Sequence, residues 1–80
     1  MDKDLAKHIA VTAFKVQSPL EDLLPLIKTH CTQEEYTLYL KAVAKVMAAI
    51  NTEITSKVFS AYPEIEKEFE QKIEKYGRII

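Results

Sequence analysis

Gly77 is the only glycine among the 80 residues of this chain. Tight hairpins between β-strands depend on glycine, most often as Asn-Gly or Asp-Gly, and the sequence offers none between its apolar stretches. The residues that dominate it, Ala, Leu, Lys and Glu, are good helix formers. A chain of this length forms one core at most. The sequence therefore predicts an all-α fold in a single domain, residues 1–80.

Local signals for helix ends divide the chain into four predicted helices, over residues 3–16, 19–30, 33–61 and 63–76. Ser18 is placed to cap the second helix, with Pro19 at its first position and Glu21 completing a capping box. Thr32 and Glu35 repeat this pattern before the third helix. The first helix is expected to end near residue 16, because a residue before proline disfavours helix and Ser18 precedes Pro19. The second helix is expected to end near residue 30.

Three further residues punctuate these helices. Pro63 follows Tyr62 and is suited to the first position of the last helix, and Gly77 is placed to end it. Pro25 lies inside the second helix, where it lacks the N–H for one helical hydrogen bond. We expect it to kink that helix or loosen its first turn.

The predicted helix over residues 33–61 carries an apolar stripe with spacings of four, three, four, three and four, which is a heptad pattern. At about 1.5 Å per residue this helix is roughly 43 Å long, more than twice the length of helix 19–30. We therefore expect much of it to lack a partner within the chain. The predicted architecture is a small irregular helical bundle organised along this one long central helix, with the first two helices covering its ends.

Surplus apolar side chains are the strongest pointer to function. On the first helix, Leu5, Ile9, Ala13 and Val16 share the face expected to turn inward, and Ala6 and Ala10 widen it. Val11 and Phe14 lie on the opposite side. Exposed apolar patches on a helical chain mark interaction surfaces. We predict a homodimer in which two copies of helix 33–61 pack antiparallel or as a bundle. The predicted interaction residues are Tyr36, Tyr39, Leu40, Val43, Met47, Ile50, Ile54, Val11 and Phe14.

The last helix is a second candidate interaction element. Ile65, Phe69, Ile73 and Tyr76 have the spacing of a helix that docks into a groove on a partner protein. The same stripe also suits packing on the chain's own core, and the sequence leaves both alternatives open.

No residue pattern indicates catalysis, a metal site or a cofactor, and we predict that the chain is not an enzyme. One cysteine, Cys31, excludes an internal disulfide. His30 and Cys31 are adjacent and point about 100° apart on a helix, and a zinc site needs three or four ligands. We interpret Cys31 as a small buried apolar group and His30 as a side chain that favours a helix C-terminus.

The charge balance argues against nucleic acid as a partner. The formal net charge is −1, so no basic footprint is present. Gln33, Glu34 and Glu35 would begin the recognition helix of a helix-turn-helix, where acids repel phosphate. No stretch approaches the roughly 20 apolar residues that cross a bilayer, and the N-terminal residues do not resemble a secretory signal. We expect a cytoplasmic protein without a membrane association.

The function predicted from these observations is a protein–protein interaction or structural module that self-associates. One alternative is a small regulatory protein that binds an apolar small ligand between its helices, near the tyrosines. A helical nucleic-acid-binding regulator is the remaining alternative.

Overall fold

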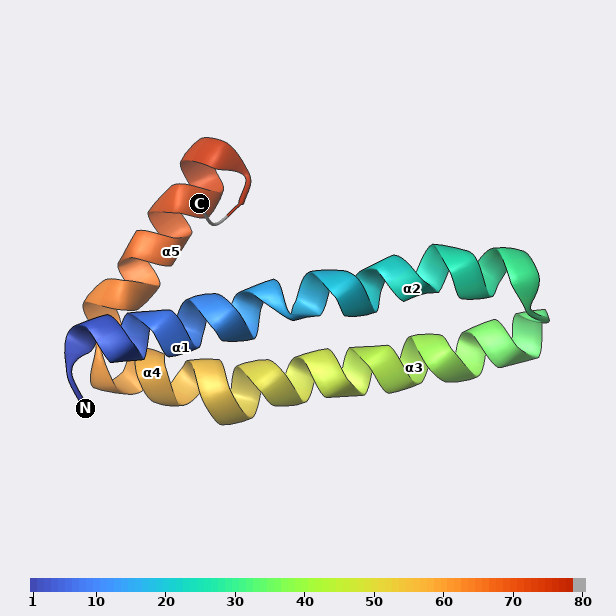
Figure 1. Cartoon of the computed structure of the whole chain (residues 1–80), viewed down its shortest axis with the longest axis horizontal. Coiled ribbons are helices and arrows are strands. Elements are labelled where there is room, and N and C mark those ends of the chain that lie inside the picture. Colours follow the sequence, from blue (N-terminus) through green and yellow to red (C-terminus); the bar gives the residue numbers. More distant parts are fainter. Residues whose placement is uncertain (79–80) are drawn as a thin grey trace.

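The computed structural model describes residues 1–78, and within them it is built from helices without strands (Figure 1). The apolar end of the predicted tail, residues 79 and 80, lies outside the described residues. The elements in order are α1 (Lys3–Lys15), α2 (Gln17–His30), α3 (Gln33–Ala49), the π-helical segment η1 (Ile50–Thr55), α4 (Ser56–Ala61) and α5 (Pro63–Tyr76). The prediction of an all-α fold is confirmed.

Two long antiparallel arms form a helical hairpin (Figure 1). The first arm, residues 3–30, consists of α1 and α2, and the second arm, residues 33–61, consists of α3, η1 and α4. The arms join at a tip around residues 31–32, and α5 leaves the opposite end, the base, at an angle to the hairpin. Residues 1–78 thus contain three long helical units rather than the four helices predicted.

The predicted break between the first two helices is wrong. Val16 keeps right-handed helical angles (φ −67°, ψ −13°), its N–H donates to the Thr12 carbonyl at 3.0 Å, and α2 begins at Gln17 without a side-chain cap. Pro19 falls in the first turn of α2, where a missing N–H costs little. The Gln17 side chain ties this junction to the second arm by donating to Asn51 Oδ1 at 3.1 Å. Helix α2 also continues through Pro25 to His30.

Because α1 and α2 join end to end, the expectation of one long central helix is wrong as well. The first arm runs beside the whole second arm: α2 contacts α3, and α1 contacts η1 and α4. The first two helices therefore do not merely cover the ends of helix 33–61. Its partner within the chain is a helical arm of matching length.

The second arm begins as predicted. Glu35 N–H donates to Thr32 Oγ1 at 3.1 Å, and Thr32 N–H donates to Glu35 Oε1 at 2.9 Å, which completes the capping box. The predicted span 33–61 is continuous, but η1 interrupts its regular winding. A π-helical turn holds one more residue than an α-helical turn, so it changes which later residues face the first arm. Val58 is buried and Phe59 is half-buried.

The core lies at the base, where α1, α4 and α5 meet. Its buried members are Ala6, Ala10, Val58, Ile65 and Phe69. Helix α5 begins at Pro63 and ends at Gly77, which adopts the left-handed conformation (φ 74°) and donates its N–H to the Ile73 carbonyl at 2.8 Å. Both predicted ends of this helix are confirmed.

Candidate functional site

The side of α1 that faces the second arm is a stripe of alanines rather than the larger apolar residues. Ala6, Ala10 and Ala13 are buried, whereas Leu5 and Val16 are about half exposed. Small side chains let two helices approach closely, so the arms pack tightly through these alanines. The expectation that Leu5 and Val16 point into the chain's own core is therefore wrong, whereas Ile9 is half-buried and packs against the core as expected.

Helix α5 covers the side of α1 that the sequence suggested was surplus. Phe14 and Phe69 make an edge-to-face contact with ring centroids 6.2 Å apart, and Val11 is half-buried against the core. Two ion pairs join the same helices, Lys3–Glu64 at 3.7 Å and Lys7–Glu68 at 3.2 Å. Val11 and Phe14 are thus largely occupied by contacts within the chain.

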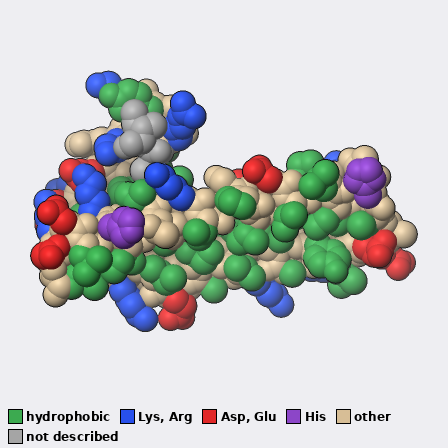
Figure 2. All heavy atoms as spheres, viewed as in Figure 1, with side chains coloured by type: hydrophobic (Ala, Val, Ile, Leu, Met, Phe, Trp, Pro, Cys, Tyr) green, Lys and Arg blue, Asp and Glu red, His purple; other side chains and the backbone are tan. Residues whose placement is uncertain are grey.

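The opposite side of the hairpin carries an apolar surface, which we call the open face. On α1, the residues that contact α5 are Lys3, Lys7 and Phe14. Two residues along a helix correspond to about 200° of rotation, so Leu5, Ile9 and Val16 point to the side away from α5. Figure 2 shows apolar side chains gathered along both arms in this view of the molecule. The open face consists of Leu5, Ile9, Val16 and Leu23 on the first arm and Tyr39, Val46, Ile50 and Ile54 on the second.

These residues are connected by helical spacing and by a shared groove. Ile9, Val16, Ile50 and Ile54 line one groove of about 360 Å³ between the arms, together with His8 and Thr12. Leu23 follows Val16 by seven residues, and Val46 precedes Ile50 by four, so each extends the same face toward the tip. The exposed fractions of the outermost six side chains lie between 43% for Ile54 and 55% for Tyr39.

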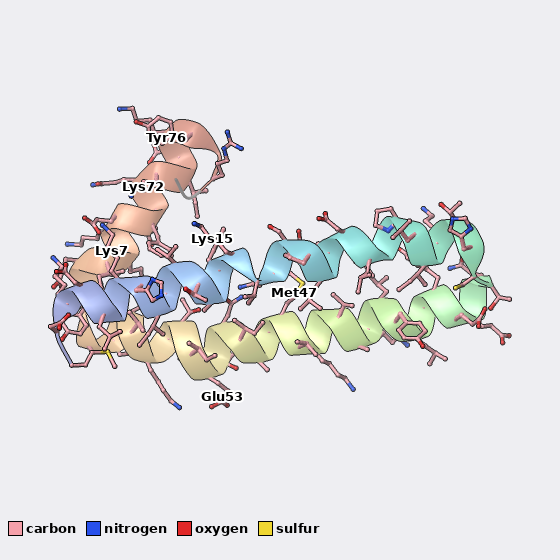
Figure 3. The ribbon with its side chains drawn as sticks, in the orientation of Figure 1. Lys7, Lys15, Met47, Glu53, Lys72 and Tyr76 are labelled. Carbon is pink, nitrogen blue, oxygen red and sulfur yellow. The ribbon has the colours of Figure 1, made fainter. Side chains whose placement is uncertain are left out.

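The predicted heptad stripe of the second arm is divided between the inside of the hairpin and its surfaces. Val43 is buried, and Tyr36, Met47 and Ile50 are half-buried. In Figure 3 the Met47 side chain lies between the arms, whereas Glu53 projects from the outer side of the second arm. Tyr39, Leu40 and Ile54 are exposed. The open face therefore shares Tyr39, Ile50 and Ile54 with the predicted interaction residues.

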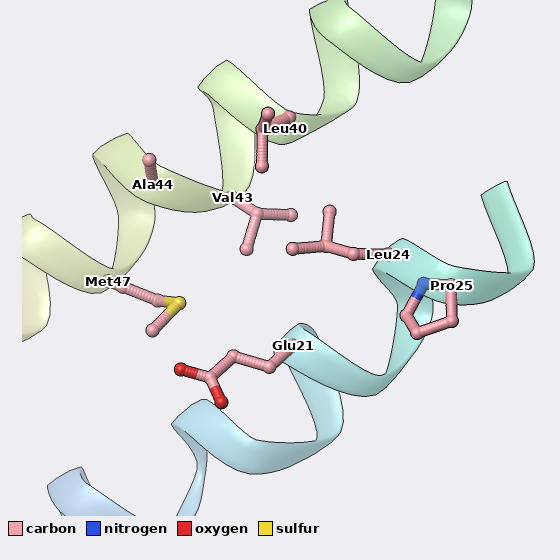
Figure 4. A pocket seen from close by; sticks show the side chains of 7 residues that line it. All are labelled: Glu21, Leu24, Pro25, Leu40, Val43, Ala44 and Met47. Carbon is pink, nitrogen blue, oxygen red and sulfur yellow. The ribbon is translucent and has the colours of Figure 1, made fainter. Parts of the chain in front are cut away.

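A second apolar depression, the hairpin groove, lies between α2 and α3 and holds about 590 Å³ (Figure 4). Its lining residues are Glu21, Leu24, Pro25, Leu40, Val43, Ala44 and Met47. Pro25 follows Phe14 by eleven residues, which is close to three helical turns, so this groove opens on the side of the hairpin from which α5 packs. Helix α5 contacts α4 at the base and does not extend over it.

The stripe on α5 is mostly used by the chain itself. Ile65 is fully buried and Phe69 nearly so, while Ile73 and Tyr76 remain exposed. Phe69 contacts the rings of both Phe14 and Phe59. Docking of this helix into a partner through all four residues would require it to leave its own core.

The polar groups at the tip are exposed. Cys31, interpreted above as a buried apolar group, is a free exposed cysteine after the end of α2, and His30 is exposed beside it. The hydrogen bonds from the Thr32 backbone and side chain hold the pKa of the Glu35 carboxyl below its ordinary value. Among residues 1–78 no three His, Cys, Asp or Glu side chains gather as a metal site.

No helix of the described chain has the length and apolar content of a membrane span. No protein-family model matches the chain, and neither do curated proteins or solved structures.

Leu5, Ile9, Val16, Leu23 and Val46 are the open-face residues that sequence reasoning missed as interaction residues. The available signal was the spacing of Ala6, Ala10 and Ala13, which places a row of small side chains along one side of α1. Such a row suits a close helix contact, and it leaves the larger residues beside it for another surface.

Proposed function

We propose that the chain is a protein–protein interaction module without catalytic activity of its own, and that it self-associates through the open face. The observation that supports this proposal is the extent of that face: large apolar side chains, about half exposed, follow both arms from base to tip. Apolar surfaces of this extent on a water-soluble chain are typical of association sites.

The shape of the molecule supports the same proposal. The Cα radius of gyration is 15.0 Å, whereas a compact chain of this length has one of about 12 Å. In the tip half, α2 and α3 form a single layer that no other described element covers, and Val43 is the one described residue there that is buried. Helical domains bury their apolar stripes by packing two layers together. A second helical pair against this layer would complete a four-helix bundle.

Charged substitutions on the open face test the proposal. Val46→Lys places a charge at the centre of the face, where association would bury it without a partner, so the associated form should be lost. Because Val46 is 48% exposed in the single chain, the substitution should leave the fold largely intact. The measurements are mass at equilibrium in the ultracentrifuge and helicity by circular dichroism.

Leu38→Lys is the matched control. Leu38 is an exposed leucine on the same helix, at 68% exposure, but it does not line the open face. This variant should keep the mass of the unmodified chain. If both variants keep that mass, or if both lose it together with their helicity, the proposed role of the open face is refuted.

Binding of an apolar small ligand is a second candidate function, and the hairpin groove is the observation that favours it. Its volume and its lining by Leu24, Leu40 and Met47 suit a compact apolar molecule. The lining residues include no tyrosine, and Tyr36 lies one helical turn before the lining residue Leu40 on α3. A ligand that binds the folded chain raises its melting temperature. Ala44→Trp, which fills the groove, should abolish such a shift.

A further inference from the structure

We propose that the occupant of the open face is the open face of a second copy, turned antiparallel so that the tip of each hairpin covers the base of the other. The proposal rests on the function proposed above, because it identifies the partner and the geometry of the same surface. The two-fold axis passes beside Val46 on the second arm.

The size of the open face suits a second copy. Arms of about 43 Å, lying about 9 Å apart, present a face on the order of 700 Å² per copy. A stable interface buries about 600–1,000 Å² on each partner, so a face of this size suffices only if the two faces overlap along nearly their whole length. The arms match each other in length, and full overlap is therefore available to two identical hairpins.

The charges along the second arm favour the antiparallel direction. Glu35 stands eleven residues before Val46, near the tip, and Lys57 stands eleven residues after it, near the base. A two-fold axis at Val46 brings Glu35 of one copy level with Lys57 of the other at both ends of the interface. A parallel arrangement would instead set Lys57 against the base of the partner's first arm, at the level of Leu5 and His8.

The middle of the second arm is free of obstacles to this contact. Ala42 and Ala49 follow Glu35 at seven-residue intervals, so the side of α3 next to Val46 carries small side chains. Lys41 and Lys45 lie two residues on either side of the buried Val43, which directs them away from the first arm and toward solvent. Glu53, which pairs with Lys57 at 3.8 Å within the chain, lies level with Tyr39 of the partner.

The first arm adds an edge that is free of permanent charge. One row of residues beside Leu5, Val16 and Leu23 carries no Asp, Glu, Lys or Arg, and Lys15 and Asp22 lie next to it, further from the open face. Its members are His8, Thr12, Pro19, Leu26 and His30. Leu26, one of the most exposed leucines, would lose water contact against the partner's first arm. Overlap of the two first arms therefore buries apolar surface without burying a charge.

Cysteine cross-linking under mild oxidation tests the geometry. In a Cys31→Ser background, Val46→Cys should form a covalent dimer, because only residues close to a two-fold axis meet their own copy within disulfide distance. Mixing a Tyr39→Cys chain with a Glu53→Cys chain should give the mixed dimer. Lys41→Cys, on the side away from the interface, should cross-link only at the background level of random collision.

The native cysteine provides the opposite test. Antiparallel packing holds the two exposed Cys31 thiols at opposite ends of the dimer, so the unmodified chain should not cross-link within it. Efficient Cys31 cross-linking without Val46→Cys cross-linking would overturn the antiparallel geometry and leave self-association standing. A mass of two chains in which none of the introduced cysteines reacts would place the interface elsewhere. A single-chain mass for the Cys31→Ser background would overturn both proposals.

Discussion

Phe69 holds α5 on the hairpin, and its removal should release that helix. The ring is 4% exposed and makes edge-to-face contacts with Phe14 and Phe59, at centroid distances of 6.2 and 5.5 Å. Truncating a buried phenylalanine to alanine costs about 3–5 kcal/mol. A core of this size supplies only about 3–5 kcal/mol of net stability in total. Phe69→Ala should therefore unfold most of the single chain or detach α5 from it.

Urea denaturation followed by circular dichroism measures this loss. Ile73→Ala is the matched control, because Ile73 lies one turn further along α5 and is 41% exposed, so its truncation should cost about 1 kcal/mol or less. Phe69→Leu should fall between the two, since it keeps apolar volume and loses both ring contacts. If Phe69→Ala costs no more than Ile73→Ala, α5 does not pack on the core as described.

Two further predictions concern polar groups. Thr55 is 7% exposed, and its Oγ1 finds no hydrogen-bond partner among residues 1–78. Thr55→Val should therefore raise the free energy of unfolding by about 1 kcal/mol, whereas Thr52→Val, at an exposed site, should not. Equal effects of the two substitutions in urea denaturation would refute the burial of this hydroxyl. Hydrogen bonds from Thr32 lower the pKa of the Glu35 carboxyl in the folded chain. The charged carboxylate therefore stabilises the fold at pH values above its ordinary pKa of 4.5, and this contribution is lost as the pH falls through the lowered pKa of the folded chain. The stability advantage of the unmodified chain over Glu35→Gln should accordingly narrow toward zero in acid, and an advantage independent of pH would contradict the role given to this charge.

Helix ends defined by local chemistry could be predicted from the sequence. Thr32 and Glu35 satisfy each other's backbone and side-chain groups across one turn, and Gly77 supplies the one left-handed residue that α5 needs. Neither feature depends on distant parts of the chain. The same local reasoning failed at Pro19, because a proline in the first turn of one helix does not prevent the preceding helix from continuing almost up to it.

The features missed by sequence reasoning depend on contacts between distant elements. The π-helical winding of η1 has no local signal in Ile50–Thr55 and accompanies its contact with α1. The row of Ala6, Ala10 and Ala13 marks the inward side of α1, but the sequence of α1 alone does not say which of the two flanking apolar sides, Leu5 with Val16 or Val11 with Phe14, is covered. The position of α5 decides between them. Helix α5 packs on Phe14, the second arm packs on the alanines, and Leu5 and Val16 remain on the open face.

The absolute mass of the unmodified chain in solution tests the central claim most directly. Light scattering after size exclusion, from micromolar to millimolar concentration, should give about twice the 9.2 kDa of one chain over the upper part of that range. A mass of 9.2 kDa that persists to the highest concentration would contradict self-association through the open face.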